Sequence, residues 1–463
     1  MRVFISAAHK SSGKTTVSIG LCAALKQRGL TVQSFKKGPD YIDPYWLSQA
    51  TGRNCYNLDF YTMSRDEILA LMTKAAADAD ISLIEGNKGL YDGLDLDGSN
   101  SNAALATLTK TPVVLVLNAR GMTRGIAPLI LGYQAFDRNV AIRGVILNRL
   151  GGSRHEAKLR NVIEHYTDVE VIGAIHNDSR FDIDERHLGL MPGHEDPFCM
   201  EKINLLADAV NEQVDLDRLL AIAANTSELP PSSAAMPATE AKPRDIRLGL
   251  MLSSAFGFYY PDDLQALENA GAEIIEIDPA RDATLPSLDA LFIGGGFPET
   301  HMAVLEANKS LRHAIKTAID DGLPCYAECG GLMYLARSIE WNGRQAEMVG
   351  SIDADIIMEK TPQGRGYVQL LETENSPWPG RSGNIINAHE FHYSRFKNVP
   401  KSVKFAYQVK RGTGINGEAD GYVYKNLLAN YTHQRNTASN PWARRFIDFA
   451  RQCKQAVQTN RTI

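Results

Sequence analysis

The sequence has little cysteine, no long apolar run and no surplus of positive charge. Its six cysteines are scattered over 463 residues, which is typical of reduced thiols rather than of a disulfide framework. No apolar run is long enough to span a bilayer, and the N-terminal stretch lacks the features of a signal peptide. The formal net charge of -5 excludes the basic face that nucleic-acid binding requires. We therefore expect a cytoplasmic protein with no nucleic-acid or membrane partner.

The chain is too long for one hydrophobic core, so at least two domains are expected. Short runs rich in β-branched residues alternate with stretches of helical periodicity, which is typical of a doubly wound α/β sheet. This pattern stops at a polar stretch rich in proline, alanine and serine, and a second α/β pattern follows it. We predict two doubly wound α/β domains, with the divisions 1–225, a linker over 226–245, 246–450, and a C-terminal tail over 451–463.

The first apolar run leads into SAAHKSSGKTT, which ends like a phosphate-binding loop (P-loop). In such loops backbone N–H groups surround the phosphates, a lysine neutralises the transferred phosphoryl group, and a Ser or Thr hydroxyl binds Mg²⁺. Lys14 is then the phosphate lysine and Thr15 the magnesium ligand. Ala8 stands where a glycine is usual, and alanine fits there if its φ stays negative. An ordinary strand–helix turn is the alternative. The candidate nucleotide-binding residues of the loop are Gly13, Lys14, Thr15 and Thr16.

Carboxylates follow in two further segments, one beside a Gly-Pro turn and one at the end of a predicted strand. The segments KKGPDYIDP and ISLIEGNKGLYDG supply Asp40, Asp43, Glu85 and Asp92. Because the carboxyl ends of parallel strands face one crevice, Glu85 is a candidate for metal binding or general-base work. Asp40 and Asp92 taken singly are also explained as turn caps. Asn148, at the end of another predicted strand, either contacts the nucleotide base through its amide or is a turn residue.

The second domain has a cysteine at the point where a buried strand meets a helix, in GLPCYAECGGLMYLA. A tight turn would lift Cys329 above the sheet at a helix N-terminus, whose dipole favours the thiolate. Glycines of FIGGGFPE and of the cysteine turn offer backbone N–H groups for an oxyanion hole. We expect Cys325 in the strand core, and a Cys-x3-Cys metal pair is the alternative. The candidate oxyanion residues are Gly295, Gly296 and Gly330.

A cysteine nucleophile needs a base, and three histidines are candidates. His389 and His392 lie in NAHEFHYSRF, and His433 lies in ANYTHQRN. For His389 and His392, structural hydrogen bonding near the substrate is the alternative to direct chemistry. The residues alone leave this choice open.

Taken together, GKTT, KKGPDYIDP, NLD and EGxxGLYDG resemble the cobyrinate a,c-diamide synthase family, whose first domain is similar to dethiobiotin synthetase. The resemblance implies that ATP and Mg²⁺ bind here and that a tetrapyrrole carboxylate is phosphorylated. It implies catalytic roles for Asp40 and Glu85, and metal binding by Thr15, Asp40 and Glu85. For Asp43 and Asp92 it implies contacts with the substrate.

Most of 246–450 resembles the class I glutamine amidotransferases of the cobalamin pathway. The resemblance makes Cys329 the nucleophile and His433 its catalytic partner, with HEFHYS as a diagnostic stretch. Most members follow that histidine with Leu-His-aromatic, whereas this chain continues with Gln434-Arg435. The surroundings of the base are therefore expected to differ from those of most members.

The two domains together predict an ATP-dependent, glutamine-hydrolysing amidoligase. ATP would convert a carboxylate into an acyl phosphate, and ammonia freed from glutamine at a cysteine thioester would displace the phosphate. The nominal substrate is cobyrinate, in cobalamin biosynthesis; sirohaem, for dissimilatory sulfite reductase, and nickel-sirohydrochlorin are the alternatives. Asn87 and Lys88 replace the usual apolar pair of EGxxGL, and Lys88 either pairs with a substrate carboxylate or is solvated. The expected partners are an acidic tetrapyrrole and glutamine, and the assembly considered is a homodimer.

Two rival hypotheses come from other classes of protein. A P-loop switch ATPase that acts by dimerising carries a second lysine five residues before the conserved one, where this chain has His9 and places Lys10 one position off. Such a switch also has no need of a Cys–His domain. A degenerate binding protein descended from the ligase is the third possibility. The residues that argue against it are the retained Lys14, Glu85, Cys329 and His433.

Overall fold

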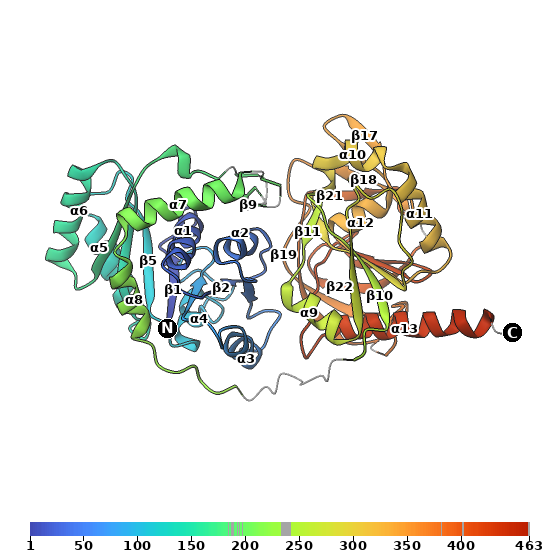
Figure 1. Cartoon of the computed structure of the whole chain (residues 1–463), viewed down its shortest axis with the longest axis horizontal. Coiled ribbons are helices and arrows are strands. Elements are labelled where there is room, and N and C mark those ends of the chain that lie inside the picture. The colour runs from blue at the N-terminus through green and yellow to red at the C-terminus, as the bar shows by residue number, and fades with distance from the viewer. Residues whose placement is uncertain are drawn as a thin grey trace. The chain divides into compact units, whose positions relative to one another are not determined.

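The computed structural model forms two compact α/β units, Met1–Met236 and Pro237–Ile463 (Figure 1). Both contain parallel strands with helices packed on them, which confirms the predicted fold class. Part of the expected linker, residues 233–241, lies outside the described residues. None of the described helices combines the length and the apolar character needed to cross a membrane. The structure describes residues 1–183, 185–186, 189–191, 193, 195–196, 198–232, 242–380, 382–400 and 402–461.

Unit 1 is built on a sheet of seven parallel strands in the order β3-β2-β4-β1-β5-β6-β7. Most positions of the strands are buried, as the continuous apolar runs of β1, β4, β5 and β6 predict. The strand order reverses beside β1, and ligands of such sheets bind at the carboxyl ends of the strands near this reversal. The strands are β1 (Arg2–Ala7), β2 (Val32–Lys37), β3 (Tyr56–Leu58), β4 (Ile81–Glu85), β5 (Val113–Asn118), β6 (Ile142–Leu150) and β7 (Glu170–His176).

Helices cover both faces of this sheet (Figure 1). Helices α3 to α6 share one apolar core with one face, and α1, α2 and α7 pack together over the other. Helix α3 begins with a capping box, in which Ser64 and Glu67 each accept the other's backbone N–H. A small ribbon of β8 (Glu185–Arg186) and β9 (Gly189–Leu190) follows η1 (Ser179–Phe181). The helices are α1 (Lys14–Gln27), α2 (Ile42–Thr51), α3 (Arg65–Ala75), α4 (Asn102–Leu108), α5 (Ile126–Phe136), α6 (Ser153–Tyr166), α7 (Cys199–Gln213) and α8 (Leu216–Ala224).

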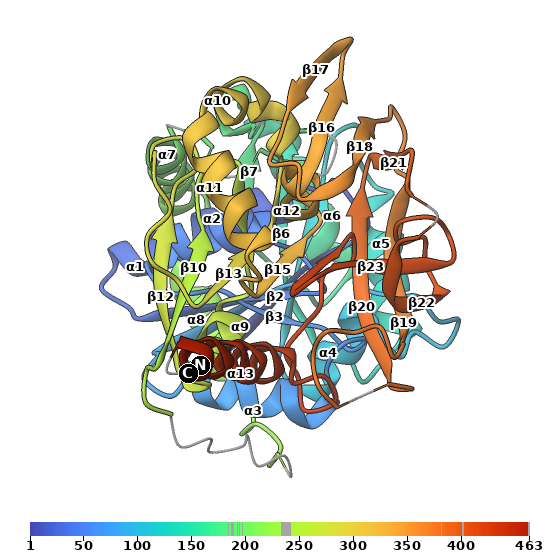
Figure 2. The ribbon, with the colours of Figure 1, turned by 90° about the vertical axis from the view of Figure 1, so that its right-hand side faces the viewer.

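Unit 2 contains a nine-stranded mixed sheet in the order β12-β10-β13-β15-β24-β23-β22-β19-β20 (Figure 2). Along this order, each strand from β12 to β24 is parallel to the next one. From β24 to β20, each strand is antiparallel to the next one. The strands of this sheet are β10 (Ile246–Met251), β12 (Ala272–Ile277), β13 (Ala290–Ile293), β15 (Cys325–Glu328), β19 (Gly364–Glu372), β20 (Ile385–His392), β22 (Lys404–Arg411), β23 (Ala419–Tyr424) and β24 (Leu427–Asn430).

Two apolar cores lie on the two faces of this sheet. Helices α10 to α12 contribute to one core, and α9 and α13 contribute to the other. A four-stranded sheet, in the order β17-β16-β18-β21, joins the first core. Helix α13 continues through residue 461 and so covers most of residues 451–463, which we predicted to be a C-terminal tail. The remaining elements are β11 (Phe256–Phe258), α9 (Pro261–Asn269), β14 (Gly295–Gly296), η2 (Pro298–His301), α10 (Met302–Ala307), α11 (Lys309–Asp320), α12 (Gly330–Leu335), β16 (Ala336–Trp341), β17 (Arg344–Glu347), β18 (Ile352–Met358), β21 (Ser394–Lys397) and α13 (Trp442–Arg461).

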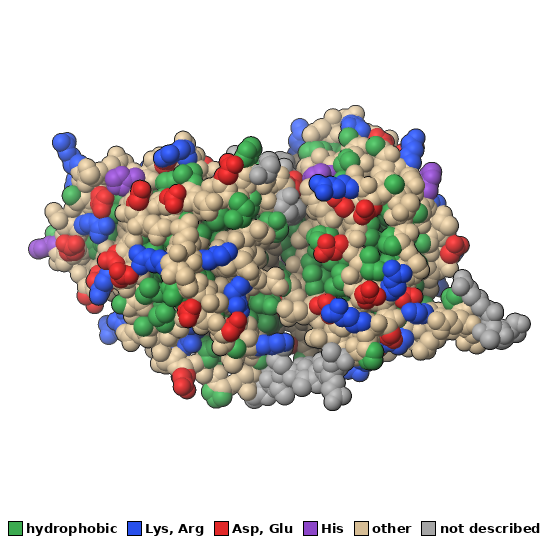
Figure 3. All heavy atoms as spheres, viewed as in Figure 1, with side chains coloured by type: hydrophobic (Ala, Val, Ile, Leu, Met, Phe, Trp, Pro, Cys, Tyr) green, Lys and Arg blue, Asp and Glu red, His purple; other side chains and the backbone are tan. Residues whose placement is uncertain are grey.

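Charged side chains of both signs are interspersed over the face of the molecule shown in Figure 3. On that face no lysines and arginines gather into a continuous basic stripe among the described residues. This distribution agrees with the small negative net charge of -5.

Candidate functional site

The phosphate loop joins β1 to α1 and closes on a glycine in the left-handed region. Gly13 has φ 83° and ψ 21°, and a Cβ at this position would lie 2.1 Å from Nδ2 of Asn148. A side chain is therefore excluded both by conformation and by space. Ala8 keeps a negative φ, and Ser11 instead takes the left-handed conformation, with φ 63°. The condition under which alanine was expected to fit the loop is thus met.

Lysines, carboxylates and a threonine converge beside this loop at the carboxyl ends of β2 and β4. The strand register sets Lys36 opposite Glu85, and Lys36 Nζ lies 3.0 Å from Glu85 Oε1. Lys36 also forms an ion pair with Asp43. The hydroxyl of Thr15 donates to Glu85 Oε1 at 2.6 Å and lies 3.2 Å from Asp43 Oδ2. Lys14 Nζ is 3.8 Å from Glu85 Oε1, so the carboxylates and both lysines form one buried network.

Asp40 belongs to the edge of this network. Its Oδ1 accepts the backbone N–H groups of Ile42 and Asp43, which is the turn-capping role. Its Oδ2 lies 3.8 Å from Lys36 Nζ. Burial, followed by the negative charge of Asp43, raises the pKa of Asp40 to about 7 against the opposing effect of Lys36. Asp40 can therefore take up and release a proton near neutral pH.

Lys36 remains charged although it is buried. Burial disfavours its ammonium, but the carboxylates of Asp43, Glu85 and Asp40 outweigh burial and raise the pKa of Lys36. Burial likewise acts to raise the pKa of Asp43, and Lys36 overcomes it, so that this pKa is lowered. Lys36 was not predicted as a site residue. Its only signal in the sequence was its place in KKGPDYIDP, directly before the segment that carries the Gly-Pro turn.

The structure does not bring Asp92 into this network. Its carboxylate accepts the backbone N–H of Gly89 at 2.8 Å and so caps an exposed turn after β4. The contact observed is the one expected of a turn residue. Its predicted contact with substrate stays a prediction.

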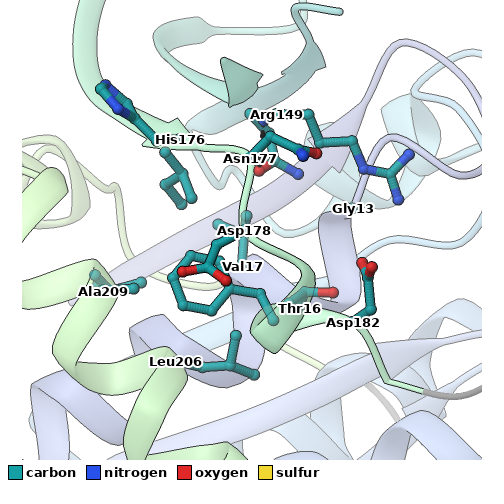
Figure 4. A pocket seen from close by; sticks show the side chains of 14 residues that line it. Gly13, Thr16, Val17, Arg149, His176, Asn177, Asp178, Asp182, Leu206 and Ala209 are labelled. Carbon is teal, nitrogen blue, oxygen red and sulfur yellow. Dashed lines mark hydrogen bonds between the residues drawn. The ribbon is translucent and has the colours of Figure 1, made fainter. Parts of the chain in front are cut away.

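A pocket opens beside the loop at Gly13 and Thr16 (Figure 4). Asn148 lines it, but its Nδ2 donates to Ser12 O at 3.0 Å and its Oδ1 accepts the N–H of Arg149. The amide therefore braces the phosphate loop, and a contact with the nucleotide base stays a prediction. Other walls come from segments that the sequence analysis did not select. These side chains include Arg149, His176, Asn177, Asp178, Phe181, Asp182 and Leu206.

In unit 2, Cys329 lies between β15 and α12 with φ 47° and ψ −102°. This conformation is strained for a residue with a side chain, and strain of this kind clusters at functional sites. The backbone N–H of Cys329 donates to Asn430 O at 2.7 Å, which fixes the turn. Burial raises the pKa of the thiol. The side chain therefore sits on a strand–turn–helix elbow as a thiol and needs a base.

Three glycines near Cys329 have no room for a side chain. A Cβ on Gly330 would lie 2.8 Å from Gly296 O, and one on Gly296 would lie 2.0 Å from Ala255 O. A Cβ on Gly295 would lie 2.5 Å from Cε1 of His433. The backbones of both glycine segments thus approach the elbow and the histidine closely. Their predicted role in an oxyanion hole stays a prediction.

The three candidate histidines have different surroundings in the structure. His433 Nδ1 lies 3.5 Å from Oε2 of Glu328, the residue before Cys329. His389 stacks on His433 with ring centroids 5.0 Å apart, and the two residues exchange backbone hydrogen bonds. Burial lowers the pKa of His389 well below its usual value, so that its ring is neutral. His392 instead stacks on Tyr431 at 3.9 Å.

The unusual residues after His433 form a buried polar layer. The guanidinium of Arg435 donates to Asp262 Oδ2 at 2.6 Å and lies 4.2 Å from the ring centroid of Tyr260. Gln434 donates through its side chain to the hydroxyl of Tyr407 at 2.9 Å. These contacts anchor the segment that carries His433 to the start of α9 and to β22. Where most members have Leu-His-aromatic, this chain therefore has Gln434 and Arg435, which anchor the segment through these contacts.

Cys325 lies in the core of β15, where its burial raises the pKa of its thiol. In the part of the chain that the structure describes, no group of three or more His, Cys, Asp and Glu residues could hold a metal ion. Cys325 therefore takes the core position expected of it.

The comparisons with known proteins match two different domain families to two parts of the chain. Residues 4–190 match the CobQ/CobB/MinD/ParA nucleotide binding domain, and residues 247–441 match the CobB/CobQ-like glutamine amidotransferase domain. The chain thus joins a nucleotide-binding domain to a glutamine amidotransferase domain, which together define a glutamine-hydrolysing, ATP-dependent ligase.

Curated relatives place the chain in a family. Proteins named cobyrinate a,c-diamide synthase from Magnetococcus marinus and Methanosarcina acetivorans are each 43% identical to it, over 96% and 97% of this chain and 95% of each relative. One from Listeria innocua is 39% identical over 93% of this chain and 95% of the relative. The chain belongs to the cobyrinate a,c-diamide synthase family, as its motifs predicted.

Proposed function

We propose that the protein amidates peripheral carboxylates of a tetrapyrrole with ATP and glutamine, and that cobyrinate is converted to its a,c-diamide. The observation that carries this proposal is the presence, in one chain, of a nucleotide site and a candidate glutamine-hydrolysing site. A phosphate loop with a buried lysine–carboxylate network lies in one unit, and an elbow cysteine near a histidine lies in the other. The name and the nearly full length of the curated relatives support the choice of substrate.

The network in unit 1 suits the activation of a carboxylate. A carboxylate does not react with ammonia because its oxygen is a poor leaving group, whereas an acyl phosphate has a good one. Lys14 would neutralise the transferred phosphoryl group from the loop. The permanently charged Lys36 would balance the negative charge that gathers when substrate and phosphate oxygens meet beside Asp43 and Glu85. Asp40, with a pKa of about 7, is suited to accept or donate a proton there.

Magnesium fits this network. Mg²⁺ is usually held by one or two carboxylates together with water and substrate phosphates. Thr15, Asp40 and Glu85 supply hard oxygen atoms, and Glu85 Oε2 is buried with no hydrogen-bond partner. These three residues would hold Mg²⁺, which when bound supplies charge stabilisation at the phosphoryl group.

The site in unit 2 suits the release of ammonia from glutamine. The sulfur of Cys329 would attack the side-chain carbonyl carbon, and His433 would take the thiol proton and return it to the departing nitrogen. The carbon–nitrogen bond breaks and a thioester remains. Water then cleaves the thioester, which releases glutamate and restores the thiol. Backbone N–H groups of Gly295, Gly296 or Gly330 would hold the oxyanion.

A parallel test of three substrates checks the proposed reaction. The protein is incubated with ATP, Mg²⁺ and glutamine and with cobyrinate, sirohaem or nickel-sirohydrochlorin, and mass spectrometry follows the exchange of OH for NH₂. We expect two exchanges on cobyrinate. Amidation of sirohaem or of nickel-sirohydrochlorin alone would overturn the choice of substrate. Glutamine hydrolysis without amidation of any of them would overturn the tetrapyrrole proposal.

A second lysine at the end of β2 gives a finer prediction about the substrate. Lys37 is 6% exposed, and its Nζ lies 3.3 Å from Oδ1 of Asn87, beside the exposed Lys88. Burial lowers the pKa of Lys37 to about 8, and Asp59 opposes this shift only in part. We propose that these two lysines contact a second acidic group of the substrate, since a buried ammonium gains most from such a partner.

Replacing Lys37 with methionine is expected to raise KM for the tetrapyrrole about tenfold and to stabilise the fold. The pKa of Lys37 is lower in the folded protein than in the unfolded chain, so its charge costs stability near pH 7 and the cost fades between about pH 8 and 10.5. We expect a gain of about 1–3 kcal/mol at pH 7, measured by urea unfolding. Lys88→Met is the control, because it removes an exposed charge and should raise KM without added stability. An unchanged KM in both variants would contradict this prediction.

A further inference from the structure

Glu328 ends β15 directly before Cys329, and its carboxylate is enclosed between this strand and the segment that carries His433. The side chain is buried, with 3% of the residue exposed. Its Oε1 accepts the hydroxyl of Tyr326 at 2.6 Å and the backbone N–H of Gln434 at 2.9 Å. Its Oε2 is left to face His433, whose Nδ1 lies 3.5 Å away.

The bonds to Oε1 prevent the carboxylate from turning away from the histidine. The hydroxyl of Tyr326 also accepts a hydrogen bond from Asn430 Nδ2 at 3.1 Å, and the carbonyl of Asn430 accepts the N–H of Cys329. Glu328 and Asn430 are register partners of β15 and β24. The same few residues therefore fix the cysteine turn and the carboxylate that faces the histidine.

Two groups close to His433 carry no negative charge. His389, stacked on its ring, is neutral because burial lowers its pKa. Arg435 is positive and is held by Asp262 and Asp263. A carboxylate at Nδ1 fixes the tautomer of an imidazole, because the proton then stays on Nδ1 and leaves Nε2 free to accept another.

We propose that Glu328 is a positioning residue of the glutamine-hydrolysing site. It keeps the proton of neutral His433 on Nδ1, and it stabilises the imidazolium that forms when the ring takes the thiol proton of Cys329. This inference rests on the proposed roles of Cys329 and His433. It assigns the orienting group of the pair to the residue directly before the nucleophile.

The test is Glu328→Gln, which preserves size and can keep the two bonds to Oε1. Its amide would present N–H groups to Nδ1 and so favour the other tautomer. We expect kcat for glutamine hydrolysis to fall by about 10²–10⁴-fold, with KM for glutamine changed less than threefold. Amidation driven by ammonia should be retained.

Tyr326→Phe is the matched variant, because it removes one bond to Oε1 and keeps the carboxylate. We expect a loss of about tenfold or less in kcat for glutamine hydrolysis. If Glu328→Gln does not fold, nitrogen NMR of His433 in the unmodified chain provides the test, with the proton expected on Nδ1. A proton on Nε2, or a folded Glu328→Gln variant with unchanged kcat, would overturn the inference. An equal loss of ammonia-driven amidation would show a structural role and would overturn it too.

Failure of this inference can be distinguished from failure of the proposed function. If Cys329→Ala abolishes glutamine hydrolysis while Glu328→Gln does not affect it, only the role of Glu328 is wrong. If Cys329→Ala retains hydrolysis, the site itself is wrongly assigned.

Discussion

Replacing Cys329 with alanine is expected to abolish glutamine-driven amidation and to leave ammonia-driven amidation largely intact. The sulfur is the only protein atom that bonds covalently to glutamine in the proposed reaction, whereas carboxylate activation depends on the other unit. We expect a loss of about 10³-fold or more with glutamine, measured as product formed per enzyme by mass spectrometry. The assay is repeated with ammonium chloride at a pH where free ammonia is present.

Cys325→Ala is the matched control for this experiment. Cys325 is buried in β15, four residues before Cys329, and has no part in the proposed chemistry. We expect a modest loss of stability from the smaller side chain and no loss of glutamine-driven activity. Equal loss of both nitrogen sources in Cys329→Ala would contradict the division of labour between the two units.

Replacing Lys14 with alanine is expected to stop amidation with either nitrogen source. Without its ammonium the phosphoryl group loses its partner in the loop, so that the acyl phosphate does not form. We expect a fall in ATP-dependent product of about 10³-fold. The measurement is ADP release together with amide formation, with glutamine and with ammonia in parallel.

Lys10→Ala is the control for Lys14→Ala, because Lys10 is an exposed lysine of the same loop. It should retain activity. A switch ATPase that depended on a second loop lysine would instead lose function in this variant, and amidation would play no part in it. Retention of ammonia-driven amidation in Lys14→Ala would contradict the proposed activation step.

The segments that carry the chemistry could be located from the sequence, because each has a local signal. GKTT after a short apolar run predicts the loop at Gly13, and glycines after a cysteine predict the elbow at Cys329. The family could be named from the same segments. Local signals succeed here because a loop between one strand and the next helix is made by consecutive residues.

Contacts made across the sheet could not be predicted in this way. Lys36 and Lys37 both end β2, and strand alternation places them on opposite faces without saying which face meets the phosphate loop. Glu328 is adjacent to Cys329, but its partner His433 lies far along the chain. The antiparallel half of the unit 2 sheet depends on register between distant strands, which no spacing in the sequence specifies.

The paired backbones of His389 and His433 have a consequence for exchanging parts between relatives. The two residues form a β-bridge, so the segment that ends in Gln434-Arg435 is attached to β20 and through it to β19. A segment grafted from a relative with Leu-His-aromatic would lack Arg435. Asp262 and Asp263 at the start of α9 would then lose this ion pair. Such a graft is therefore expected to give an active protein only when the HEFHYS strand and the start of α9 are transferred with it. These three segments, although distant in sequence, have to be exchanged together.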